Sequence, residues 1–79
     1  MVLMNNIDFI GSNILINNYA GLCKINNLKA TSTSSNSFSV NANQLGEIIL
    51  NNLHSYSRIA HSGKITFNNC YINMENITQ

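Results

Sequence analysis

The stretch FSVNANQLGEIILNNLHSYSRIAHSGKITFNNCYI, residues 38–72, decides the predicted fold. Asn41 and Gln44 have the spacing of a helix N-cap and its reciprocal partner, and Val40 and Leu45 have that of a hydrophobic staple. Gly63 then suits a left-handed helix end. Apolar residues between these signals recur at the three- and four-residue spacings of one helix face: Leu45, Ile48, Ile49, Leu53, Tyr56, Ile59 and Ala60. The pattern predicts a central amphipathic helix over about residues 42–61.

After Gly63 the period changes from 3.6 to 2. Ile65 and Phe67 alternate with polar residues, which predicts a half-buried strand over about residues 64–72. A shorter alternation at residues 38–40 precedes the predicted helix. A strand, a helix and a strand in this order favour a parallel pair covered by the helix, within a mixed α/β (α+β) domain.

The first thirty residues are strand-like and contain a recurring pattern of apolar-x-apolar-Asn-Asn-apolar. Asn tolerates positive φ, so each Asn pair can turn the chain tightly. Two structures fit: short hairpins, or a small β-solenoid in which Asn pairs mark stacked corners. The intervals between pairs are irregular, which favours N-terminal hairpins and leaves the solenoid or repeat fragment as the alternative. The pairs are Asn5-Asn6, Asn17-Asn18, Asn26-Asn27, Asn51-Asn52 and Asn68-Asn69.

Residues 31–37 contain only Ser, Thr and Asn, which predicts a mobile loop between the two halves. Neither half is long enough for a domain of its own, so we expect one domain over residues 1–79. So small a core often relies on self-association.

The composition excludes several partner classes. A formal net charge of +1 provides no basic patch for nucleic acid. No apolar run approaches the roughly 18 residues of a membrane span. Cys23 and Cys70 are far apart and both lie at apolar-alternating positions, which fits buried free thiols in a reducing compartment. We therefore expect a cytoplasmic protein that binds neither nucleic acid nor membrane.

Two segments resemble the leucine-rich repeat core L-x-L-x-x-N/C-x-L: Phe38-x-Val40-x-x-Asn43-x-Leu45 and Ile65-x-Phe67-x-x-Cys70-x-Ile72. The resemblance covers less than half of the chain. It implies a helix between the two strands, with Asn43 and Cys70 turned inward to bond neighbouring backbone. It also implies that Ser39 and Thr66 point to a concave binding face.

No motif for catalysis, cofactor binding or metal binding stands out. His54 and His61 are seven residues apart, whereas helical zinc ligands are three or four apart, so a site combining them with Cys23 or Cys70 is not favoured. Asp8, Glu47 and Glu75 are the only carboxylate side chains, too few for an oriented triad or a catalytic pair to be expected. We predict a protein that is not an enzyme and needs no cofactor.

The remaining function classes are interaction classes. Low charge, a surface of uncharged polar residues and an open C-terminal strand edge favour a protein-interaction or self-assembling module, and a homo-oligomer. A small inhibitor or immunity-type protein that blocks an enzyme or toxin is the alternative. The candidate partner contacts are Ser39, Thr66 and Tyr71; Tyr71 is expected to point away from the apolar side of its strand.

Overall fold

A computed structural model describes residues 1–32 and 38–72 of the chain. These residues form strands and contain no helix. The strands are β1 (Val2–Gly11), β2 (Ile14–Ser32), β3 (Phe38–Ser55), β4 (Ile59–Gly63) and β5 (Ile65–Asn68). Every strand pairs in parallel, in one sheet.

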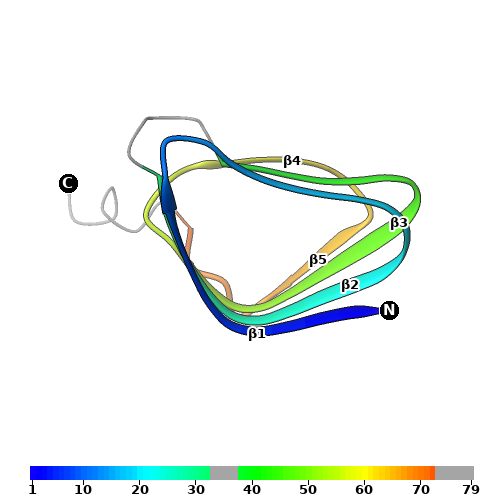
Figure 1. Ribbon diagram of the computed structural model, residues 1–79, viewed down its shortest axis with the longest axis horizontal. Helices are drawn as coiled ribbons and strands as arrows, with labels where there is room; N and C mark the ends of the chain where they lie inside the picture. Colours follow the sequence, from blue (N-terminus) through cyan, green and yellow to red (C-terminus); the bar gives the residue numbers. More distant parts are fainter. Residues whose placement is uncertain (33–37, 73–79) are drawn as a thin grey trace.

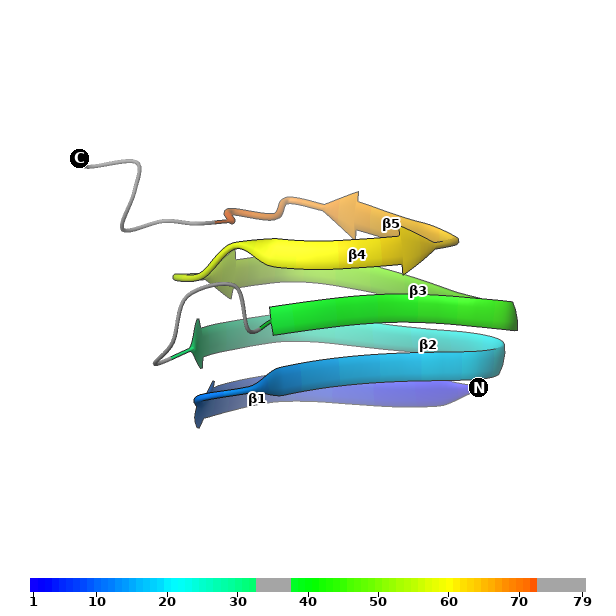
Figure 2. The same ribbon diagram turned by 90° about the horizontal axis from the view of Figure 1, so that it is seen from above.

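The sheet is wound into a β-solenoid. Viewed along the short axis, the chain turns repeatedly around a common centre (Figure 1), and in the perpendicular view its turns lie on one another like rungs, with the N-terminus at one end (Figure 2). Successive coils start on Val2, Cys23, Ile48 and Ile65, which are aligned Cα to Cα. The alternative considered from the sequence therefore describes the fold.

Each full coil has three sides, which the strand register defines. The first side consists of residues 2–5, 23–26, 48–51 and 65–68. The second consists of residues 7–11, 28–32 and 53–55, and Tyr71 rejoins it through a bridge to His54. The third consists of residues 14–18, 38–42 and 59–63. The long strands β2 and β3 each bend around corners from one side to the next (Figure 1).

The core lies inside the coils and is built from columns of aligned apolar side chains. On the first side Ile25 lies on Leu50, and on the second side Leu28 lies on Leu53; all four are fully buried. On the third side fully buried Phe38 lies between Ile14 and Ile59. Burial of these side chains supplies the main driving force for folding, because residues 1–32 and 38–72 include no helix that could cover the sheet.

The predicted helix at residues 42–61 is wrong: residues 42–55 belong to β3 and residues 59–61 to β4. Ile48 and Leu50 are buried with the period of two that a strand requires, and Leu53 and Ser55 resume that period three residues later. The added residue is the corner at Asn51-Asn52. The predicted helical stripe combined Ile48 and Leu53, which are buried, with Leu45, which is 84% exposed. It also included Ile49, which is aligned with Lys24 and Thr66 at an outward position. Its spacings of three and four therefore do not mark one face of the chain. The mixed α/β class is therefore replaced by an all-β solenoid.

The signals proposed for the helix start have other roles. Val40 is fully buried, but Leu45 is 84% exposed, so the two form no hydrophobic staple. The Asn41 side chain bonds Asn17 and Ser62 on adjacent coils rather than capping a helix. Gly63 does have a positive φ of 88°, at the end of β4.

The N-terminal hairpins are also absent, because β1 pairs with β2 in parallel and not with itself. The helix that the leucine-rich repeat resemblance implies between its two segments is missing. A strand does occupy part of the predicted 64–72 range, namely β5. Most of the loop predicted at residues 31–37 lies outside the described residues.

The Asn pairs build the corner between the first and second sides, which we call the Asn corner. The second Asn of each of four pairs has a left-handed backbone, with φ between 54° and 60°: Asn6, Asn27, Asn52 and Asn69. Among residues with a β-carbon, Asn adopts this conformation at unusually low cost. The expectation that Asn pairs turn the chain is thus confirmed, although they turn a solenoid and not a hairpin.

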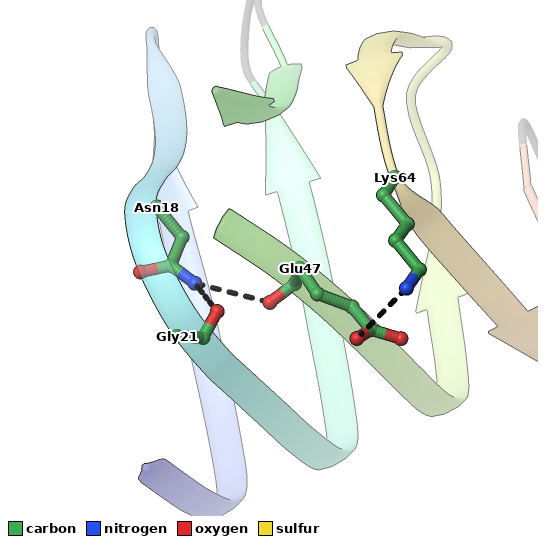
Figure 3. A network of polar contacts seen from close by, with 4 residues as sticks. All are labelled: Asn18, Gly21, Glu47 and Lys64. Carbon is green, nitrogen blue, oxygen red and sulfur yellow. Dashed lines mark hydrogen bonds and ion pairs between the residues drawn. The ribbon is translucent and has the colours of Figure 1, made fainter. Parts of the chain in front are cut away.

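The corner between the third and first sides is held by different means (Figure 3). The Asn18 amide donates to the carbonyl oxygen of Gly21 at 2.9 Å and to that of Glu47, one coil on, at 3.0 Å. A Cβ atom at Gly46 would overlap the backbone carbonyl of Asn18, and one at Gly63 would overlap that of Ala42. These two glycines allow successive coils to approach at this corner.

Candidate interaction surfaces at the two ends of the solenoid

Side-chain hydrogen bonds between coils form ladders along the Asn corner. Asn26 Nδ2 donates to Asn5 Oδ1 at 3.0 Å, Asn51 to Asn26 at 2.9 Å, and Asn68 to Asn51 at 2.9 Å. A second ladder joins Asn6, Asn27 and Asn52. Stacked amides of this kind satisfy one another in cross-β structures.

The ladders have a direction. In every step the later coil donates and the earlier coil accepts, and the same holds on the third side from Ser62 to Asn41 and from Asn41 to Asn17. Among the described residues, the Asn5 amide nitrogen therefore has no acceptor at one end of the first ladder, and the Asn68 amide oxygen has no donor at the other. The solenoid has a donor end and an acceptor end.

At the N-terminal end, side chains at inward positions are exposed to solvent. Met4 stands in the column of Ile25 and Leu50, but it is 37% exposed, and Val2, aligned with buried Cys23, is also exposed. Ile7 and Phe9 are only half-buried. A hollow of about 280 Å³ opens here, and Met4, Phe9 and Ile25 are among the residues that line it. The described residues supply no further coil to cover this apolar face.

The C-terminal end is open in the same way. Phe67 continues the Met4 column and is half-buried, as are Ile59, Ile65, Cys70 and Ile72. A hollow of about 680 Å³ lies over this end, lined by Ile59, His61, Phe67, Asn69, Cys70, Tyr71 and Ile72. His61 is aligned with buried Val40, and its ring meets that of Phe67 edge-on with 5.4 Å between centroids. Apolar columns thus end exposed at both ends of the stack.

The three residues predicted as partner contacts do not form one surface. Ser39 lies on the third side, between Leu15 and Ala60. Thr66 lies on the first side beside Ile49 and is exposed. Tyr71 lies on the second side, 53% exposed, with its ring stacked on His54 at 5.2 Å. Each stands at an outward position of a different side.

The groups considered for metal binding are also separated. His54 is on the outside of the second side, whereas His61 is at the C-terminal end of the third. No group of three or more His, Cys, Asp or Glu side chains close enough to hold a metal occurs in residues 1–32 and 38–72.

The two cysteines are free thiols in different surroundings. Cys23 is buried on the first side, and burial raises the pKa of its thiol above the ordinary value. Cys70 is half-buried, and its Sγ donates to the backbone oxygen of Leu50 at 3.4 Å. The expectation of a buried free thiol is therefore met by Cys23 and only partly by Cys70, which is half-buried.

Charges contribute little to these surfaces. The ion pair between Lys64 Nζ and Glu47 Oε1, at 3.5 Å, lies at the exposed corner shown in Figure 3, where solvent screens it. The described part of the chain contains no helix that is long and apolar enough to span a membrane.

No family model matches this chain, and neither a curated protein nor a solved structure shows significant similarity to it. An open edge at the C-terminal strand was expected from the sequence, but the two apolar end faces were not, because an inward residue looks the same in an inner coil and in an end coil. The signal that could have found them is the pattern apolar-x-apolar-Asn-Asn-apolar, read as one corner per coil at residues 5, 26, 51 and 68.

Proposed function

We propose that this chain is a non-enzymatic protein-interaction module that assembles with other protein chains, above all with copies of itself, through the two ends of the solenoid. The observation that supports this function is that inward columns remain exposed at both ends. Burying such apolar surface is favourable, and an edge strand offers unpaired backbone groups to another strand. We further propose a cytoplasmic location, which the two free thiols favour.

Solenoids gain stability from contacts between neighbouring coils, and their terminal coils need a cover. None of the described residues covers Met4 or Phe67, whereas the lateral surface between the ends is mostly polar or interrupted by charge. Lys24 separates Leu3 from Ile49 on the first side, for example, and Lys29 follows Asp8 on the second. The ends are therefore better suited to a protein partner than the sides.

The test is the mass of the full chain in solution, measured by light scattering over a wide range of concentration. The wild type should increase in mass with concentration. A double variant, Met4→Lys with Phe67→Lys, places a charge on both end faces and should remain a monomer. The matched control is Leu45→Lys, which introduces the same charge at a lateral residue and should associate as the wild type does.

A wild-type chain that stays monomeric at every concentration would overturn self-assembly, as would loss of association in the Leu45→Lys control alone. Circular dichroism of all variants establishes that the strands are retained.

A further inference from the structure

We infer that the partner of each end is the opposite end of a second copy, so that copies stack head to tail with β1 of one lying on β5 of the next. This inference rests on the proposed function and specifies its geometry. In the stack, residues 2–6 of one copy align with residues 65–69 of its neighbour. The Asn5 amide nitrogen then donates to the Asn68 amide oxygen across the interface.

Hydrogen-bond polarity supports this pairing. Every ladder step runs from a donor on the later coil to an acceptor on the earlier coil. Among the described residues, the Asn5 nitrogen at one end has no acceptor and the Asn68 oxygen at the other end has no donor, so these two ends match. Two N-terminal ends placed face to face would bring two donors together.

The side-chain columns give the same register. Val2, Cys23, Ile48 and Ile65 form one inward column, and Met4, Ile25, Leu50 and Phe67 form the next. Placing Val2 on Ile65 and Met4 on Phe67 of a second copy continues both columns with apolar contacts. Such a contact repeats the one that Ile65 already makes with Ile48 inside the chain.

Strand direction excludes the symmetric alternative. All pairs in the solenoid are parallel, and only a head-to-tail copy presents a parallel strand to each free edge. A copy turned over, with β1 against β1, runs antiparallel, and its Asn corner no longer lies on that of its partner. No charged residue occurs in residues 65–72, so Asp8 of the incoming copy meets no like charge there.

The contact involves the first and second sides. On the third side the last described strand is β4, which pairs with residues 38–42 of the preceding coil. Along the stack, β4 therefore lies one coil before β5, the last strand of the first side. Asn17 of the incoming copy, on its third side, therefore has no described strand directly opposite. This asymmetry provides a control for the register.

Single end variants test the head-to-tail arrangement. Met4→Lys blocks the N-terminal end and Phe67→Lys blocks the C-terminal end, so each variant alone should be a monomer. An equal mixture should form a one-to-one heterodimer and nothing larger, because one unblocked interface remains. Dimers in either variant alone would overturn the inference, since an end would then pair with itself. A monomeric mixture, with an associating wild type, would also overturn it.

A milder pair of variants tests the register in a chain that retains its fold. Asn5→Asp keeps the oxygen that accepts from Asn26 but removes the outward donor and adds a charge, so association should weaken at least tenfold. Asn17→Asp makes the same change at the same end, keeps the acceptor for Asn41, and lies on the third side. It should associate as the wild type does. Equal weakening in both variants would overturn the register but leave end-to-end assembly standing.

Cross-linking measures the register directly. Outward positions 3 and 66 become neighbours in the proposed stack, at the spacing of adjacent strands, which a disulfide can bridge. Chains with Leu3→Cys and chains with Thr66→Cys, each also carrying Cys70→Ser, should form heterodimers on oxidation. Leu15→Cys in place of Leu3→Cys should not. Cross-linking with Leu15→Cys alone would overturn the proposed alignment.

Discussion

The inner coils and the end coils of this solenoid place apolar side chains in one column and leave them in different environments. Ile25 and Leu50, in the inner coils, are 1% and 0% exposed, whereas Met4, in the first coil, is 37% exposed and Phe67, in the last, is half-buried. All four point inward from aligned positions. The difference is whether a coil lies both above and below the residue along the stack. Burial in a solenoid is thus decided by neighbouring coils and not by the local sequence.

The largest difference between inner and end coils should appear on truncating this column. Leu50→Ala removes a fully buried side chain between two coils and should lower the free energy of unfolding by about 2–5 kcal/mol. Met4→Ala should lower it by less than about 1 kcal/mol in the monomer, because its side chain is already partly in water. Denaturant unfolding at low protein concentration measures both. Equal losses would mean that the end coil is covered in solution.

The next largest loss of stability is expected where coils approach closely, at the corner between the third and first sides. Gly46→Ala introduces a Cβ atom that overlaps the Asn18 carbonyl and should lower the free energy of unfolding by about 1–3 kcal/mol. Gly11→Ala is the control near the N-terminal end, where the new atom meets nothing closer than 3.9 Å. Thermal unfolding should separate the two variants clearly. An unaffected Gly46→Ala would show that the coils can move apart without cost.

An effect of similar or smaller size is expected along the Asn ladder. Asn51 bonds to both neighbouring coils, at 2.9 Å in each case, whereas Asn5 bonds to one. Because a hydrogen bond contributes about 0.5–1.5 kcal/mol net, Asn51→Ala should lower the free energy of unfolding by about 1–3 kcal/mol and Asn5→Ala by about half as much. Denaturant titration compares them. A larger loss for Asn5→Ala would contradict the ladder as the source of the effect.

The smallest perturbation is chemical modification of the two thiols. Burial raises the pKa of Cys23, so less of it is thiolate at any pH than for an exposed cysteine, and reagent cannot reach it without opening of the fold. Cys70, half-buried at the C-terminal end, should react first with a thiol reagent in native protein. Peptide mapping of the labelled site measures the order. Faster labelling of Cys23 would show that the inner coil opens more readily than the end.

Part of this fold was predictable from residues close in sequence. The alternation of Ile65 and Phe67 correctly predicted a strand, and Asn pairs were correctly expected to turn the chain. The helix was predicted wrongly because the corner at Asn51-Asn52 shifts the alternation. Ile49, at an outward position, and Leu53, which is buried, therefore have the four-residue spacing of one helix face. The irregular intervals argued against a solenoid, yet they have a simple structural cause. The ladder steps span 21, 25 and 17 residues at one corner, and the pair Asn17-Asn18 belongs to another.

By itself, the sequence determined the local conformations: extended segments between Asn pairs, and a left-handed residue at the second Asn of four of the pairs. Only the tertiary structure decided that these segments stack in parallel, which side chains are buried between coils, and which form the two open ends. The physical reason is that pairing between coils joins residues about twenty positions apart. A short-range pattern does not indicate which segment stacks on which. It also does not indicate that no described residue covers the last coil.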